Sequence, residues 1–338
     1  MRKIQLLLIF TILLFASSFY YLPYYVSKPG MAKELEPIIE VDGGYDEEGS
    51  FMLTTIRMGR ANVYAYILAK LDEYSEIHPV EDIRAENETD EEYTMRQLHM
   101  MDTSKTSAIE VAYKKAGLPI EYDYKGVYVL QVIPGMPAEG KLTVGDRIIE
   151  IDGQRFSSSK EFIDYVSSKQ EGDQLTFTAE TDGSKREVDI KLQKFDETSE
   201  RVGIGISLVD DKEIKVQPSI EMDTDEIGGP SAGLMFSLEI YNQLSKTDLT
   251  KGYAIAGTGT ISTDGTVGRI GGIEQKIVAA DKAGADYFLA PNEEGAADSN
   301  YQIALKTAKD IKTSMEIIPV NTFDDAVEFL ENLPAKTS

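Results

Sequence analysis

The chain has 338 residues, enough for two domains that each bury a core of their own. Its formal net charge is −24, which disfavours binding to the phosphate backbone of nucleic acids. It has no cysteine and only two histidines, His78 and His99, so we expect no disulfide, no thiol nucleophile, no metal site and no cofactor.

The first apolar segment is uncharged over residues 4–27 and follows the cationic pair Arg2 and Lys3. A helix of this length crosses about 30 Å of hydrocarbon, and the four tyrosines near its end suit a membrane interface. We therefore expect a cytoplasmic N-terminus over residues 1–3, a single transmembrane anchor over residues 4–27, and the rest of the chain outside the cell. A cleaved signal peptide is the alternative, because residues 16–18 are small.

The next part of the chain, residues 28–121, mixes strand-like and helix-like patterns. Residues 49–58 alternate as a strand does, and residues 61–74 have helical apolar spacing. The acidic run over residues 81–93 predicts a solvated loop. The pattern over residues 94–117 predicts a long helix that Gly117 ends.

Residues 122–197 predict a compact, mainly-β module. Four short β-rich pieces, GVYVLQVI, DRIIEIDG, QLTFTAET and KREVDIKL, are separated by turn residues. One helix is expected among them, over residues 157–170, with a serine as its N-cap. Over residues 198–338, strand-like and helical pieces alternate instead, which predicts a layered α/β domain.

One lysine in this last domain lies where a lysine is unexpected. In GGIEQKIVAADKAG, four residues share the apolar face of a helix: Ile273, Lys276, Ile277 and Ala280. Three polar residues are expected to be solvated: Glu274, Gln275 and Lys282. Burial lowers the pKa of a lysine, and the neutral amine is a competent general base. The alternative is a stem that reaches the surface.

A candidate nucleophile, Ser231, begins the helical run in GGPSAGLMFSLEI. Unpaired N–H groups and the positive end of the helix dipole could stabilise an oxyanion there. Glycines at 228, 229 and 233 leave room for a substrate backbone, and Pro230 fixes the direction of the chain. A serine that only caps the helix is the alternative.

Together these segments resemble the proteolytic domain of Lon-type serine proteases. The resemblance covers the GPSAG motif, the segment from Thr258 to Gly265, and the IGGIEQK helix start 45 residues after the serine. It implies that Ser231 is the nucleophile and Lys276 the general base of a Ser–Lys dyad, and that Thr258 orients the lysine. The other members of the serine motif are then supporting residues: Gly229, Pro230, Ala232 and Gly233.

Two departures from the Lon pattern stand out. Many Lon proteases carry an acidic residue directly before GPS, where this chain has Gly228. Asp223, Asp225 and Glu226 are nearby candidates for that role. The chain also contains no G-x-x-x-x-G-K-[ST] phosphate loop, so we expect peptide cleavage without ATP.

The middle module resembles a PDZ domain of the bacterial protease type, on the residues KGVYVLQVIPGMPAEGKLTVGDRIIEIDGQRF. PDZ domains bind extended peptides along an exposed strand edge and hold a terminal carboxylate. The resemblance assigns this carboxylate loop and edge strand to Gly126, Val127, Tyr128 and Val129. A purely structural or autoinhibitory module is the alternative.

We therefore expect an α/β (α+β) Lon-type proteolytic domain that begins within residues 28–121 and continues over residues 198–338. A PDZ domain over residues 122–197 is expected to be inserted in it, after an N-terminal transmembrane helix. The whole arrangement is similar to the SepM-like membrane-anchored peptidases of Gram-positive bacteria.

The resemblance implies a serine endopeptidase that cleaves exported peptides or small membrane proteins at the outer face of the cell membrane. Its partners are then peptide or protein substrates and the membrane, and a homo-oligomer is possible. The alternative is a surface scaffold in which the PDZ domain recruits partners and the protease-like domain is inactive.

Overall fold

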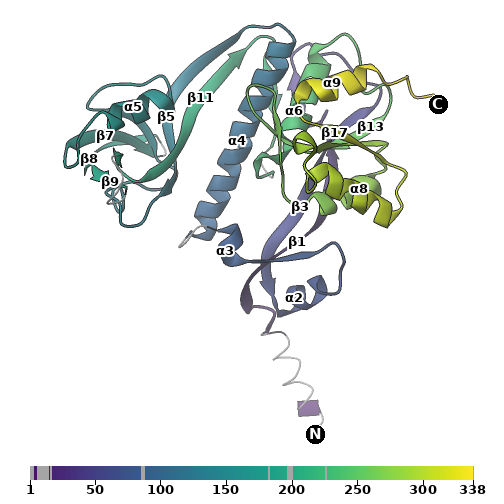
Figure 1. Cartoon of the computed structure of the whole chain (residues 1–338), viewed down its shortest axis with the longest axis horizontal. Helices are drawn as coiled ribbons and strands as arrows, with labels where there is room; N and C mark the ends of the chain where they lie inside the picture. The colour runs from purple at the N-terminus through teal and green to yellow at the C-terminus, as the bar shows by residue number, and fades with distance from the viewer. Residues whose placement is uncertain are drawn as a thin grey trace. The chain divides into compact units, whose positions relative to one another are not determined.

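The computed structural model describes residues 4–5, 15, 17–84, 88–181, 183–195, 201–224 and 227–337. The chain forms two compact units, both visible in Figure 1. Unit 1 consists of Met1–Thr89, Gln97–Pro119 and Gln217–Ser338, and unit 2 of Asp90–Arg96 and Ile120–Val216. The long helix α4 (Asp90–Lys115) therefore contributes residues to both units.

Unit 1 is built on a six-stranded sheet in the order β17-β16-β13-β3-β1-β4. The strands from β17 to β3 are parallel to one another, whereas β1 runs antiparallel to both β3 and β4. The bounds are β1 (Tyr21–Glu34), β3 (Ser50–Asn62), β4 (Glu76–Pro79), β13 (Ala254–Gly257), β16 (Tyr287–Pro291) and β17 (Glu316–Val320).

Helices connect and cover the parallel part of this sheet, as parallel strands require. They are α6 (Gly233–Leu244), α7 (Ile273–Ala283), α8 (Asn300–Ile311) and α9 (Phe323–Glu331), with the short 3₁₀ turns η1 (Pro230–Ala232) and η2 (Glu293–Gly295). Two further helices, α2 (Val63–Ala69) and α3 (Val80–Ile83), lie against the antiparallel strands at the other end of the sheet. Two small two-stranded sheets complete the unit: β2 (Ile39–Val41) with β12 (Ile220–Met222), and β14 (Thr260–Ile261) with β15 (Val267–Gly268).

Local sequence explains where the helices of unit 1 begin and end. Gly272 and Gly284 bracket α7 in left-handed backbone conformations that glycine adopts without strain. Thr322 and Asp325 form a capping box at the start of α9. One core cluster lies between α7, α8 and the sheet, and Ile277 and Phe288 are buried within it.

Unit 2 contains a five-stranded sheet in the order β11-β5-β6-β7-β8 and one longer helix. The bounds are β5 (Ile120–Val132), β6 (Arg147–Ile151), α5 (Ser159–Ser167), β7 (Gln174–Thr181), β8 (Ser184–Lys191) and β11 (Ile206–Val216), with the short pair β9 (Gln193–Lys194) and β10 (Val202–Gly203). Its core includes Val129, Ile148, Phe162 and Phe177. This core is separate from that of unit 1.

The main segment of unit 2 begins and ends in two strands that pair along their whole length. Strands β5 and β11 are antiparallel, from Ile206 opposite Val132 to Val216 opposite Ile120 (Figure 1). The first and last residues of the segment Ile120–Val216 are therefore direct cross-strand neighbours. The chain leaves unit 1 and returns to it through adjacent positions.

The predicted transmembrane anchor over residues 4–27 is wrong. Strand β1 begins at Tyr21, inside the predicted span, and pairs with β3 and β4. Tyr25 and Ser27 are buried while their neighbours are more exposed, which is the alternation of a strand rather than a lipid-facing helix. Residues 1–3, 6–14 and 16 lie outside the described residues.

Within the described residues, we find no helix whose length and apolar character would let it cross a membrane. This finding contradicts the predicted single-pass localisation at the cell membrane, with its cytoplasmic N-terminus and extracellular catalytic part. The prediction failed because an uncharged, tyrosine-rich sequence is compatible with a buried strand as well as with a membrane helix.

Candidate active site

Ser231 lies in the short turn η1 directly before α6. Gly229, which precedes this turn, has φ of 85°, a conformation that favours glycine. Pro230 then occupies the first position of the turn, where its missing N–H costs no hydrogen bond. The serine is half-buried at the start of a helix that is itself almost fully buried.

Lys276 lies in the first turn of α7, and only 2 % of its surface is exposed. Helix α7 packs against β1 and β3 on one side and against α8 on another. For this reason Gln275 is also fully buried, and the prediction that it is solvated was wrong. The single-face pattern missed it because α7 is covered from two sides.

The amine of Lys276 meets three oxygen atoms at hydrogen-bond distance. Its Nζ lies 2.9 Å from Ser231 Oγ, 3.0 Å from Thr258 Oγ1 and 2.8 Å from the main-chain carbonyl oxygen of Thr54. The structure thus brings together the three polar residues that the sequence singled out. Burial lowers the pKa of Lys276 to about 7, because the charged form loses its hydration.

The partners of the amine determine where its lone pair points. The Thr54 carbonyl can only accept a hydrogen bond. Thr258 donates its own hydroxyl hydrogen to the main-chain oxygen of Ser231, at 2.9 Å, so its Oγ1 accepts from the lysine. A neutral amine has two hydrogens, and these two acceptors use both. The lone pair is then left for the hydroxyl hydrogen of Ser231.

Thr54 was not found from the sequence. It contributes a carbonyl oxygen, a group that every residue has, so no residue pattern identifies it. The register of the sheet places it: Leu53 of β3 lies opposite Gly257 of β13, and the Thr54 hydroxyl donates to the Gly257 carbonyl at 3.1 Å. The sheet therefore holds Thr54 beside the strand that leads to Thr258.

The other members of the serine motif serve close packing. A Cβ at Gly233 would lie 2.7 Å from a methyl carbon of Ile261 and 2.8 Å from Ser104 Oγ, so only glycine fits. Ala232 is buried. The main-chain oxygen of Ser231 also accepts from the N–H of Gly259, at 2.9 Å. The loop of Ser231 is thereby tied to the segment that carries Thr258.

Helix α4 also contacts the loop of residues 228–231, which we call the serine loop. Sequence reasoning did not assign this role to α4. Ser104 Oγ donates to the Pro230 carbonyl at 3.1 Å, and the Gly229 N–H donates to the Gln97 carbonyl at 3.0 Å. Of the acidic candidates for assisting the dyad, Asp223 is exposed, and Asp225 and Glu226 lie outside the described residues.

The predicted peptide-binding segment of unit 2 lies in the interior of its sheet. Gly126, Val127, Tyr128 and Val129 belong to β5, which pairs with β6 on one side and with β11 on the other. Val127 and Val129 are buried in the core. These residues therefore offer no free edge, because the flanking strands use both sides of β5.

Strand β11 is at the end of the sheet order, and a groove runs beside it. The groove has a volume of about 190 Å³ and lies between β11, the start of β10 and α5. Its lining is mainly apolar, and Arg201 adds a positive charge: Phe162, Ile163, Val166, Phe195, Arg201, Val202, Ile204, Ile206 and Leu208.

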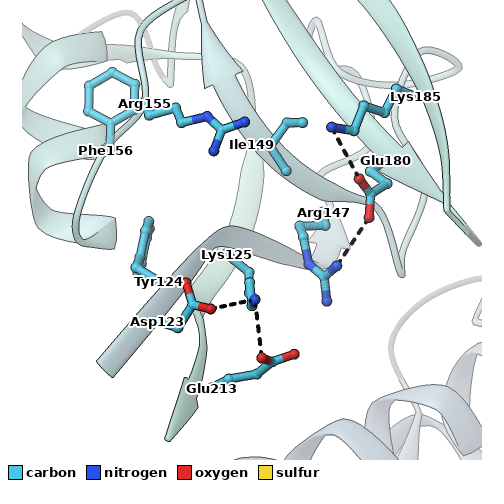
Figure 2. A pocket seen from close by; sticks show the side chains of 10 residues that line it. All are labelled: Asp123, Tyr124, Lys125, Arg147, Ile149, Arg155, Phe156, Glu180, Lys185 and Glu213. Atoms are coloured by element: carbon cyan, nitrogen blue, oxygen red, sulfur yellow. Dashed lines mark hydrogen bonds and ion pairs between the residues drawn. The ribbon is translucent and has the colours of Figure 1, made fainter. Parts of the chain in front are cut away.

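A second pocket of unit 2, of about 350 Å³, is polar (Figure 2). Most of its charges are paired with one another: Lys125 lies 2.7 Å from Asp123 and 3.1 Å from Glu213, while Glu180 pairs with Arg147 at 3.2 Å and with Lys185 at 3.8 Å. Arg155, also in the lining, pairs instead with Glu150 at 3.0 Å.

Two protein-family models match the chain. The model of the Lon protease (S16) C-terminal proteolytic domain matches residues 163–332, just over half of the 338 residues. A PDZ domain model matches residues 97–192. The chain therefore belongs to the Lon protease (S16) C-terminal proteolytic domain family, and it contains a PDZ domain.

Known proteins resemble parts of the chain. Lon protease 2 of Bacillus subtilis is 37% identical over 111 residues, which are 32% of this chain and 18% of that protein. The Lon protease of Mycoplasma mobile is 34% identical over 110 residues, 32% of this chain and 12% of that protein. The Lon protease of Rickettsia bellii is 29% identical over 130 residues, 38% of this chain and 16% of that protein.

The matches thus span less than a fifth of the length of these relatives. Among solved structures, the PDZ domain of an SdrC-like protein from Listeria monocytogenes is 45% identical to the chain. That match covers 26% of this chain and 90% of that one, with a TM-score of 0.25.

Proposed function

We propose that this protein is a serine endopeptidase that uses Ser231 as nucleophile and Lys276 as general base. The observation that carries the proposal is the distance of 2.9 Å between Lys276 Nζ and Ser231 Oγ, with the lysine buried and its pKa lowered to about 7. Membership in the Lon protease family supports peptide-bond hydrolysis.

The reaction begins when the neutral amine of Lys276 takes the hydroxyl proton of Ser231 and the oxygen attacks the peptide carbonyl. Negative charge then develops on that carbonyl oxygen. The positive end of the dipole of α6 lies beside Ser231 and stabilises this charge. Lys276 returns the proton to the leaving amine, and water hydrolyses the acyl-enzyme by the same route.

Cleavage of an unstructured protein tests this proposal. We expect the full chain to cut fluorescently labelled casein, and the Ser231→Ala and Lys276→Met variants to lose at least about 10³-fold of the rate. Lys282→Met is the matched control, because Lys282 is an exposed lysine of the same helix. A Ser231→Ala variant as active as the unaltered chain would overturn the mechanism.

We also infer that cleavage needs no ATP. The printed sequence has no phosphate-loop motif that would bind the nucleotide. The rate with casein is therefore expected to stay the same when Mg²⁺ and ATP are added, and a clear rise on addition would contradict this inference. Substrates are expected to be peptides and flexible protein segments.

The PDZ domain is proposed to hold peptide substrates in the groove beside β11. The free side of β11 can pair with an extended peptide, and the apolar lining can accept its side chains. Ile163 is an exposed residue of this lining, so Ile163→Glu is expected to weaken casein cleavage without unfolding the protein. The control is Lys160→Ala, at an exposed position of the same helix.

A further inference from the structure

Gln97 of α4 lies against the backbone that leads to the proposed nucleophile. A Cβ at Gly228 would be 3.2 Å from Gln97 Cβ, and a Cβ at Gly229 would be 3.2 Å from Gln97 Oε1. The Gln97 carbonyl also accepts the hydrogen bond from the Gly229 N–H, at 3.0 Å. The Gln97 side chain therefore packs against the backbone of Gly228 and Gly229, three and two residues before Ser231.

This contact leaves little room for a side chain at position 228. Distances of 3.0–3.4 Å are tighter than ordinary contacts between side-chain carbons, so any larger residue at 228 would push Gln97 away. The backbone at 228 is exposed, and Gln97 is half-exposed beside it. Because Gly228 has no side chain, the Gln97 side chain can occupy the space beside the serine loop.

Gln97 lies on the more exposed side of the loop that carries Ser231. On its other side the serine contacts Lys276, and Thr258 binds both of them, and these two residues are almost fully buried. Ser231 itself is half-buried, and the exposed Gly228 and the half-exposed Gln97 lie on the more open part of the same loop. Within the described part of the chain, the Gln97 carboxamide has no hydrogen-bond partner, so both of its N–H groups are available.

We propose that Gln97 binds the substrate: its Nε2–H donates a hydrogen bond to a main-chain carbonyl of the peptide, next to the bond that is cut. Such a bond does not depend on the side chains of the substrate and fixes the course of the peptide over the serine loop. The inference rests on the proposed peptidase function.

Steady-state kinetics with labelled casein separate binding by Gln97 from support of the loop. Loss of one neutral hydrogen bond raises KM roughly three- to tenfold in Gln97→Ala, while kcat stays within about twofold of that of the unaltered chain. Gln97→Glu keeps the size of the side chain but only accepts hydrogen bonds, so it is expected to raise KM at least as much. Leu98→Ala, at the exposed neighbouring position, is the control and should leave both constants unchanged.

Each possible outcome of these kinetics either supports or overturns the proposed role of Gln97. Unaltered KM in Gln97→Ala, or in Gln97→Glu, overturns the inference. A fall in kcat at constant KM also overturns it, because Gln97 would then only shape the serine loop. If the full chain and Ser231→Ala are equally inert, the peptidase proposal itself fails and the inference fails with it. If the full chain is active and the Gln97 variants have normal kinetics, only the proposed role of Gln97 fails. The peptidase proposal then stands.

Discussion

At the scale of single residues, Lys276 is buried, and its neutral amine can still donate a hydrogen bond to each of two acceptors. Its hydrogens go to the Thr54 carbonyl and the Thr258 hydroxyl, and its lone pair faces Ser231. The protonated amine instead donates all three hydrogens, including one to Ser231 Oγ. In that state the lysine cannot take the serine proton.

This difference predicts how activity depends on pH. The pKa of Lys276 is lowered to about 7 by burial, so the amine is mostly protonated at pH 6 and mostly neutral at pH 8. The rate of casein cleavage is expected to rise about tenfold per pH unit below 7 and to level off above 8. Initial rates between pH 5.5 and pH 9 check this, and a flat profile through pH 7 would contradict the lysine as base.

Thr258 predicts a second outcome at this scale. Thr258→Val keeps the shape of the side chain but removes the acceptor for Lys276 and the donor to the Ser231 carbonyl. We expect activity to fall on the order of 10²-fold because the dyad loses its alignment, with the midpoint of thermal unfolding little changed. Thr258→Ser keeps the hydroxyl and should retain most of the activity.

Sequence reasoning singled out Ser231 and Lys276 but not the residues that surround them. Ser231 and Lys276 are recognisable because a serine motif and an inward-facing lysine occur at a fixed spacing. Thr54, Ser104 and Gln97 are brought to the site by sheet register and helix packing between distant segments. No local pattern contains that information.

At the scale of elements, α6 carries a buried carboxyl group eight residues after Ser231. Glu239 is fully buried, and its Oε1 accepts from Gln243. Burial raises the pKa of Glu239 to about 7. Burial and the charge of Glu239 raise the pKa of Glu47 to about 8, and Asn242 Nδ2 donates to Glu47 Oε2 at 2.8 Å. Asp248 and Glu36 add negative charge around the pair.

These shifts predict that stability falls as the pH rises from about 4.5 to about 8. Both folded pKa values are above the unfolded value of 4.5, so between pH 4.5 and pH 8 the folded state binds more protons than the unfolded state. The contribution of the pair to the free energy of unfolding therefore falls as the pH rises through this window. Glu239→Gln should flatten that fall and raise stability at pH 8.

Urea unfolding at pH 5.5 and pH 8 measures the effect. The expected difference between the two pH values is smaller in Glu239→Gln than in the unaltered chain. Glu328→Gln, at an exposed position of α9, should behave like the unaltered chain. An unchanged pH dependence in Glu239→Gln would show that the carboxyl is ionised in the folded protein.

Elements with a strong period and clear end signals were predicted well. The strand over residues 49–58 is confirmed as β3, and the helix over residues 94–117 as α4. The predicted loop over residues 81–93 was partly wrong, because the helix α3 occupies its start, up to Ile83, and α4 begins within it, at Asp90. Residues 85–87 lie outside the described residues. Acidic residues are compatible with the first turn of a helix as well as with a loop, so charge alone does not decide between them.

At the scale of the whole molecule, the two units have separate hydrophobic cores. Phe177 is fully buried in the core of unit 2, and Phe288 in that of unit 1. Each substitution by alanine is expected to cost about 3–5 kcal/mol of stability in its own unit. Calorimetry of Phe177→Ala and Phe288→Ala should therefore show two transitions, each lowered by one of the two variants. A single transition that both variants lower equally would contradict this independence.

The pairing of Ile120 with Val216 also affects how much chain entropy the insertion costs the domain that carries it. A long flexible insertion lowers the stability of its host because its ends must be brought together, at an entropic cost that grows with length. Here the inserted segment Ile120–Val216 holds its own ends at the spacing of two neighbouring strands. To the host, the folded insertion is equivalent to a tight hairpin turn. A module attached in this way can be lengthened, exchanged or removed with little effect on the chain entropy of the domain that carries Ser231.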